Sequence, residues 1–97
     1  MFKSYEVKKN TGRITNVRVL DVDLALGKIT VWHKKHEPGR VLDKITTFFV
    51  TKDAQIKDVY GRALQLSNIK PDSRVSVDYV KESDCRLIAS YLVVAVK

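Results

Sequence analysis

The sequence predicts an all-β protein, folded as a single small barrel of five strands with an OB-like order. β-Branched residues recur in short alternating runs, and clusters of Gly, Pro and Asp separate these runs at spacings typical of turns. Residues 53–69 lack clear alternation and suit no more than one short helical turn. Together these observations favour closure of a small twisted sheet on itself, which removes its exposed edges.

Length and composition indicate one folded domain, residues 1–97. The chain has 97 residues, of which 44% are hydrophobic and 30% charged. This size allows one modest core and is too small for two.

Three related tripeptides mark the first three strands: Arg13-Ile14-Thr15, Lys28-Ile29-Thr30 and Lys44-Ile45-Thr46. Their spacing of fifteen and then sixteen residues fits a three-stranded meander. Asp21 and Asp23 with Gly27 indicate the first turn, and Glu37-Pro38-Gly39 indicates the second. We expect the third strand to run from about Lys44 to Lys52.

The first strand contains an irregularity. Ile14 and Val17 are three residues apart and cannot both face inward on a regular strand, whereas Val17 and Val19 can. A bulge near Thr15 and Asn16 would reconcile them and bend the strand.

The last two strands form a predicted hairpin after the irregular crossover. Arg74 to Val80 alternates cleanly, with Val75, Val77 and Tyr79 predicted inward. A polar turn follows, and residues 85–96 form a largely apolar final strand. Five strands in this order predict an OB-like barrel, with an SH3-like barrel or an open sandwich as alternatives.

Most of the chain resembles a bacterial family of small β-barrel domains. The family pattern runs Val-Thr-x-Asp-Thr-x-Ile, a Gly-containing turn, Leu-x-x-Leu-x-x-Gly-Asp-x-Val-x-Val-x-Tyr and Ala-x-x-Ile. The residues that match are Val50, Thr51, Asp53, Ile56, Gly61, Leu66, Ile69, Arg74, Val75, Val77, Tyr79 and Ala89. Ala54 and Asp72-Ser73 depart from the pattern, where the family usually has threonine and Gly-Asp. The resemblance implies a barrel and no particular activity, since most members are of unknown function.

No combination of residues predicts catalysis, a metal site or a cofactor. The chain has no Gly-rich phosphate loop, and its one cysteine, Cys85, cannot build a thiolate site alone. His33 and His36 are three residues apart and would point to opposite faces of a strand. We therefore expect a binding protein and not an enzyme.

The charge distribution favours an anionic partner, with solubility alone as the alternative role of a net positive surface. The formal net charge is +7, and residues 1–52 hold eleven Lys and Arg against five Asp and Glu. Alternation in GKITVWHKKH turns Ile29, Val31 and His33 to one face and places Trp32, with Lys28 and Lys34, on the other. Phe48 is expected inward, which leaves Phe49 outward beside Trp32.

These residues predict weak, sequence-tolerant binding of single-stranded DNA or RNA. Trp32 and Phe49 would stack on bases, while Lys28, Lys34 and Arg18 would contact phosphates. The alternative is a protein-interaction or assembly domain, for example at the cell envelope. In that case Trp32 would be covered by the crossover, by Phe2 and Tyr5, or by a second subunit.

No apolar run is long enough for insertion into a membrane. The N-terminal residues also lack the apolar core of a signal peptide. We expect a cytoplasmic protein as the sequence is written, or a periplasmic one if a leader has been removed. The sequence predicts no oligomeric state.

Overall fold

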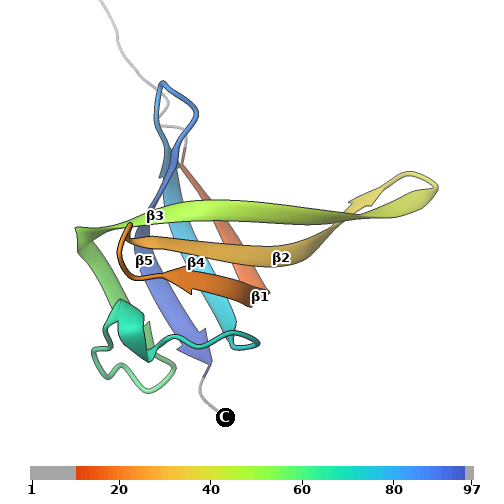
Figure 1. Ribbon diagram of the computed structural model, residues 1–97. Coiled ribbons are helices and arrows are strands. Elements are labelled where there is room, and N and C mark those ends of the chain that lie inside the picture. The colour runs from red at the N-terminus through yellow and green to blue at the C-terminus, as the bar shows by residue number, and fades with distance from the viewer. Residues whose placement is uncertain (1–10, 96–97) are drawn as a thin grey trace, which may run out of the picture.

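The structure, a computed structural model, describes residues 11–95 and forms a closed barrel (Figure 1). Around the barrel the strands follow the order β1, β2, β3, β5, β4. Neighbouring strands are antiparallel except β3 and β5, which are parallel. The elements are β1 (Thr11–Asp23), β2 (Lys28–Glu37), β3 (Arg40–Asp58), the 3-10 turn η1 (Leu66–Asn68), β4 (Arg74–Lys81) and β5 (Leu87–Ala95). The predicted OB-like barrel, with one short helical turn between the third and fourth strands, is confirmed.

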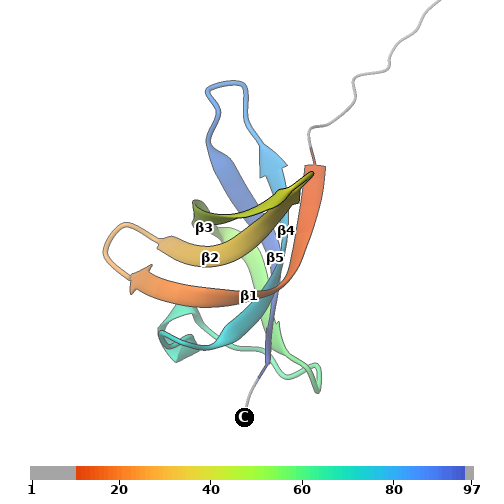
Figure 2. The same cartoon turned by 90° about the vertical axis from the view of Figure 1, so that its right-hand side faces the viewer.

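Strand β1 serves two neighbours because it bends along its length (Figure 2). Its first part pairs with β4, and from Arg18 onward it pairs with β2. The register with β4 shifts between Ile14 and Val17, and Asn16 adopts a positive φ of 53°. The predicted bulge is therefore confirmed, and it lets one strand close the barrel.

Strand β3 is longer than predicted at both ends. It was expected to end near Lys52, but it continues to Asp58 and pairs there with β5. The register between these strands shifts between Val50 and Gln55. The prediction of an irregular segment from residue 53 is wrong, because this local shift disturbs the alternation on which strand prediction depends.

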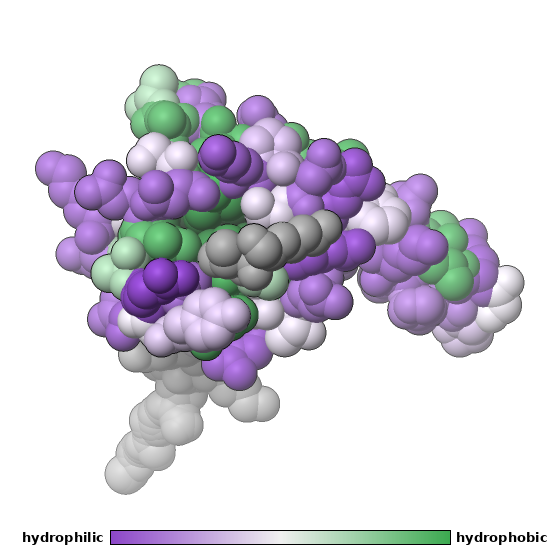
Figure 3. All heavy atoms as spheres, turned by 90° about the horizontal axis from the view of Figure 1, so that it is seen from below, coloured by the Kyte–Doolittle hydropathy of each residue, from purple (hydrophilic) through white to green (hydrophobic). Residues whose placement is uncertain are grey.

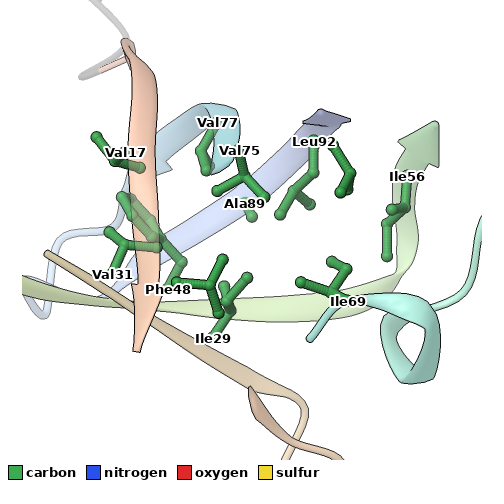
Figure 4. Packing of buried hydrophobic residues seen from close by; sticks show 12 residues of the cluster. Val17, Ile29, Val31, Phe48, Ile56, Ile69, Val75, Val77, Ala89 and Leu92 are labelled. Atoms are coloured by element: carbon green, nitrogen blue, oxygen red, sulfur yellow. The ribbon is translucent and has the colours of Figure 1, made fainter. Parts of the chain in front are cut away.

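The core fills the barrel with inward side chains from all five strands and from Ile69 beside η1 (Figure 4). The predicted inward positions Ile29, Val31, Val75 and Val77 are each at most 1% exposed. Phe48 is 1% exposed, and its ring centroid lies 5.2 Å from that of Tyr79. The other members of the cluster are Val17, Val19, Ile56, Ala89, Leu92 and Val94.

A buried carboxylate organises the turn that follows β3. Asp58 accepts hydrogen bonds from the backbone N–H groups of Tyr60 and Arg62, at 2.9 Å each, and from Arg62 Nε at 2.8 Å. Burial alone would raise the pKa of Asp58, but these hydrogen bonds outweigh it and lower the pKa below the ordinary 3.8. The carboxylate therefore stays charged and holds the turn.

The hairpin of β2 and β3 projects beyond the barrel as a two-stranded ribbon, seen at the right of Figure 1. Within the described residues, β1 pairs with β2 only from Lys28 to Trp32, and β5 pairs with β3 only from Phe49 onward. The surface of this projection is mostly polar with a small apolar group (Figure 3). In residues 11–95 no helix is long and apolar enough to cross a membrane.

Candidate functional site

A small cavity, here called the barrel mouth, opens where the ribbon leaves the barrel. Its volume is about 100 Å³, which corresponds to roughly three water molecules at about 30 Å³ each. The inward alternation of β2 places His33 here, one inward position after the fully buried Val31. The apolar lining consists of Ile14, Phe48, Tyr79 and Leu87, and the polar lining of His33, Lys44 and Thr46.

His33 is the central polar group of the barrel mouth. Its Nε2 atom lies 3.2 Å from Thr46 Oγ1, within hydrogen-bond distance. Partial burial lowers the pKa of His33 below 6.5, and the positive charge of Lys44 lowers it further. The imidazole is therefore neutral at pH 7, the form in which a ring nitrogen can act as a ligand.

Lys44 lies directly across the ladder from His33. The two residues are register partners in the β2–β3 pair. Directly opposed side chains on one sheet face have their Cβ atoms about 4.5–5.5 Å apart. The barrel mouth therefore combines a neutral imidazole with an ammonium group, and none of its lining residues carries a carboxylate.

Tyr79 lines the barrel mouth, and its ring lies against Gly12 of β1. An added Cβ at Gly12 would lie 2.5 Å from the Tyr79 hydroxyl oxygen and 2.6 Å from Cζ. Such distances are too short for non-bonded atoms, so a side chain at Gly12 would push Tyr79 aside. Because Tyr79 packs on Phe48, the shape of the cavity depends on glycine at this position.

A second hollow, here called the basic hollow, lies beside the barrel mouth and shares His33 with it. Its volume is about 390 Å³, and its charged lining residues are Lys34 and Arg74. Lys34 Nζ lies 5.8 Å from the Trp32 ring centroid, a cation–π distance. Arg74 Nη1 donates to the carbonyl oxygen of Asn16 at 3.4 Å. The other lining residues are Thr15, Asn16, Val17 and Trp32.

The residues predicted to bind a ligand fall into two separate groups. Trp32 and Lys34 lie on the basic hollow, whereas Lys28 Nζ lies 5.1 Å from the Phe49 ring. Phe49 pairs with Lys28 and Trp32 pairs with Ile45, so the two aromatic residues are four ladder positions apart. At about 3.3 Å per residue this is roughly 13 Å. The expectation that Phe49 lies beside Trp32 is wrong, although Phe48 does point inward as predicted.

The fifth predicted residue, Arg18, is already paired within the protein. Its Nη2 atom lies 2.7 Å from Asp72 Oδ1, and its Nε donates to the same oxygen at 2.8 Å. Binding a phosphate would require this ion pair to open. Phe2 and Tyr5, considered as a cover for Trp32, lie outside the described residues.

A larger hollow, of about 530 Å³, lies at the other end of the barrel. Its charged lining residues are Lys70 and Asp72, and Asp72 is the residue paired with Arg18. Because the carboxylate of Asp72 is already paired, this hollow does not bring together several unpaired charged groups that could bind one ligand. Over the whole described range, residues 11–95, no three His, Cys, Asp or Glu side chains group closely enough to hold a metal ion.

Sequence reasoning identified His33 as an inward residue but interpreted it as a strand end. It did not connect His33 with Lys44 and Thr46. The turn between β2 and β3 is sufficient to predict that these residues lie together. A two-residue connection at Pro38 and Gly39 pairs Glu37 with Arg40, and counting back along the ladder from that pair brings His33 opposite Lys44.

The fold and the mouth define this protein as a small OB-like barrel with a polar opening beside its core. No family model matches the chain, and no curated protein matches it either. Solved structures of CusF from Escherichia coli are similar in fold. Apo-CusF has 19% sequence identity and a TM-score of 0.65, and the match covers 97% of this chain and 98% of that chain.

Two further solved structures of the Escherichia coli protein contain metal ions. CusF with Ag(I) is 19% identical, with a TM-score of 0.63 and coverage of 89% of this chain and 92% of that chain. A tryptophan-to-alanine variant of CusF with Cu(II) is also 19% identical, with a TM-score of 0.63 and coverage of 92% and 96%. At this identity the likeness establishes the fold.

These findings overturn the prediction of single-stranded nucleic-acid binding. Two of the solved structures with this fold contain Cu(II) or Ag(I), and they give no support to the protein-interaction alternative. The geometry explains the error: Arg18 is paired with Asp72, and Trp32 and Phe49 are too far apart for successive bases to stack on both. Neither the ion pair of Arg18 nor the distance between Trp32 and Phe49 can be predicted from alternation along a single strand.

Proposed function

We propose that this chain is a non-catalytic barrel that binds a metal ion at its mouth, with the imidazole of His33 as the protein ligand. The observation that carries this proposal is the half-buried, neutral imidazole of His33 at the opening of the cavity. The Ag(I) and Cu(II) structures with the same fold support it. Imidazole nitrogen is a common ligand for copper, zinc and nickel.

The donor atoms of the barrel mouth favour Cu²⁺ over Ag⁺. Its polar lining offers a nitrogen from His33 and a hydroxyl oxygen from Thr46, and none of its lining residues contains sulfur. Soft monovalent ions prefer thiolate or thioether ligands, whereas Cu²⁺ heads the affinity order of divalent ions at nitrogen and oxygen sites. A single imidazole beside Lys44 makes the site weak compared with sites that have three or four protein ligands.

The absence of catalysis is part of the proposal. The displaced pKa values of acidic and basic side chains other than His33 have local causes, namely hydrogen bonds and ion pairs with nearby residues. Asp78 is held below its ordinary pKa by a hydrogen bond from Arg13, and Asp84 by a backbone hydrogen bond from Arg86. These groups do not converge on the barrel mouth, so they do not supply an acid and a base to one bound molecule.

Metal titration followed by tryptophan fluorescence tests the proposal. Trp32 is the only tryptophan and lies next to His33 in the chain, so Cu²⁺ at the barrel mouth should quench its emission. We expect quenching by Cu²⁺ to saturate at one ion per chain, at lower concentration than any effect of Ag⁺.

A pair of histidine variants identifies the ligand. His33→Gln should abolish saturable quenching, whereas His36→Gln, which removes the only other imidazole from the exposed ribbon, should leave it unchanged. Circular dichroism confirms that both variants fold. Equal binding by His33→Gln and the wild type would disprove the proposed site.

A further inference from the structure

We propose that the basic hollow binds a small aromatic carboxylate, with the carboxylate held by Lys34 and Arg74 and the ring packed on Trp32. This site is additional to the barrel mouth and does not depend on it, because none of its groups has to hold a metal ion. The residues that carry the proposal come from three strands that meet here, β1, β2 and β4.

The basic hollow lies where β1 separates from β2. The two strands pair from Arg18 and Trp32 to the turn that joins them, but β1 bends at its bulge and its earlier residues pair with β4 instead (Figure 2). Within residues 11–95, no ladder therefore joins residues 15–17 of β1 to residues 33–34 of β2. Such a fork leaves donors on both strands open to a ligand.

The charges of the basic hollow favour an anion. Lys34 and Arg74 line it, and it has no acidic lining residue. Neither of them takes part in the ion pairs recorded for residues 11–95. Arg74 also lies directly across the β1–β4 ladder from Arg18, and like charges in that position destabilise a sheet. Asp72 neutralises Arg18 at 2.7 Å, so within the described chain the second arginine lacks a counter-charge.

Arg74 is held where it can meet a carboxylate. Its Nη1 atom donates to the backbone carbonyl oxygen of Asn16 at 3.4 Å, so the guanidinium lies against the bulge of β1. The remaining N–H groups of the guanidinium can donate to a ligand in the bidentate geometry that suits a carboxylate. The hydroxyl of Thr15 and the side-chain amide of Asn16 are exposed on the same strand and add neutral donors.

The size of the basic hollow and its apolar lining favour an aromatic acid over a bare inorganic ion. Its volume of about 390 Å³ has room for roughly thirteen groups the size of water, more than sulfate or acetate fills. Trp32 and Val17 give a ligand apolar surface to cover. A flat ring can stack on Trp32 while its carboxylate reaches Lys34, whose Nζ lies 5.8 Å from the Trp32 ring centroid.

Asp43 is the acidic residue that competes for Lys34. The two residues are register partners in the β2–β3 ladder, although the ion pairs recorded for the described chain do not include them. A directly opposed carboxylate attracts the ammonium group toward β3 and away from the basic hollow. Removal of this carboxylate should therefore strengthen ligand binding, which provides a variant with an effect of opposite sign.

Titration of metal-free protein with benzoate tests the proposal. Two-dimensional NMR, in a buffer without other carboxylates after treatment with a chelating resin, should show saturable shifts at Thr15, Asn16, Lys34, Arg74 and the indole N–H of Trp32. Acetate, which lacks the ring, should bind about tenfold more weakly because it buries less apolar surface. Benzyl alcohol, which lacks the charge, should bind about fivefold more weakly. Added sodium chloride should weaken benzoate binding, because exposed charges are screened.

Four variants locate the carboxylate. Lys34→Gln and Arg74→Gln should each weaken benzoate binding by about fivefold, the effect of one exposed charge pair. Lys35→Gln removes the same charge from the next residue of β2, which faces the other side and has its Nζ 3.8 Å from Glu37 Oε2. This control should change the affinity by less than about twofold, whereas Asp43→Asn should increase the affinity by about twofold.

Two results would overturn the proposal. Equal benzoate affinity in the wild type, Lys34→Gln and Arg74→Gln would show that the carboxylate is not bound in the basic hollow. Acetate that binds as tightly as benzoate would show that no ring packs on Trp32 and would remove the aromatic acid as the ligand. Lys34 is exposed, so Lys34→Gln remains informative if Arg74→Gln does not fold. Because no metal ion is present in these titrations, their failure would leave the proposed metal site standing.

Discussion

The closed part of the barrel and the projecting ribbon are built from the same strands but are stabilised differently. In the closed part each strand pairs on both sides, and side chains such as Val31, Phe48 and Val77 are at most 1% exposed. In the ribbon β2 and β3 pair mainly with each other, and Val41 and Ile45 are 52% and 64% exposed. His33 lies at the boundary, anchored by the barrel and reachable from solvent.

The largest expected effect contrasts two positions on β3, one in each region. Phe48→Ala should lower the free energy of unfolding by about 3–5 kcal/mol, because it leaves a cavity in the core. Ile45→Ala should change it by less than about 0.5 kcal/mol, because that side chain is already largely in water. Urea denaturation followed by Trp32 fluorescence measures both.

Phe48→Leu provides a smaller change if Phe48→Ala does not fold. It should still cost more than Ile45→Ala, since it also removes packing against Tyr79. Equal losses at Phe48 and Ile45 would show that the ribbon contributes to the stability of the barrel as much as the core does, contrary to the contrast drawn above.

A second, smaller effect contrasts two glycines. Gly12→Ala should destabilise the protein by about 1–3 kcal/mol, because its Cβ would displace the Tyr79 ring. Gly39, in the ribbon turn, has a φ of +80° and no neighbour within 4 Å of an added Cβ. Gly39→Asn should therefore be tolerated, since asparagine adopts positive φ more readily than other residues with side chains.

The Gly12 variant also tests the barrel mouth. If Tyr79 shapes the cavity, Gly12→Ala should weaken Cu²⁺ binding even under conditions where the protein is fully folded, whereas Gly39→Asn should not. Thermal denaturation and copper titration of both variants provide the comparison. Unchanged stability in Gly12→Ala would mean that β1 moves away from β4 at no cost.

Much of the barrel could be predicted because alternation is a local property. The two-residue period of a β-strand alone correctly predicts the inward positions Ile29, Val31, Val75 and Val77. The end of β3 was not predicted, because a register shift between Val50 and Gln55 interrupts the alternation. Bulges of this kind depend on how distant strands meet, which a single strand's pattern does not encode.

The site was harder to predict than the fold because it depends on register. Trp32, the only tryptophan, is the residue that the sequence predicts as the centre of the site, yet the polar residues that converge are His33, Lys44 and Thr46. Their convergence follows from the pairing of β2 with β3 across the two-residue turn. An error of one residue in that turn would move Lys44 to the other side of the ribbon.

The smallest expected effect concerns the protonation of His33. Its pKa should lie below 6.5, mainly because of burial and secondly because of Lys44. Lys44→Gln should raise this pKa but leave it below 6.5, since the larger cause is untouched. Two-dimensional NMR of the imidazole signals across a pH series measures the shift, with His33→Gln used to assign the resonance.

This shift also predicts how stability depends on pH. Because the folded-state pKa of His33 is lowered, the unfolded chain takes up a proton first as the pH falls. The contribution of neutral His33 to the free energy of unfolding is fully present above pH 6.5. It declines as the pH falls from 6.5 to the folded-state pKa of His33. Lys44→Gln should narrow this pH range, because it brings the folded-state pKa closer to 6.5, and Lys52→Gln should leave the range unchanged. A His33 pKa at or above 6.5 in the wild type would mean that the imidazole is better solvated than the barrel mouth implies, and that its ring nitrogen competes with protons at neutral pH.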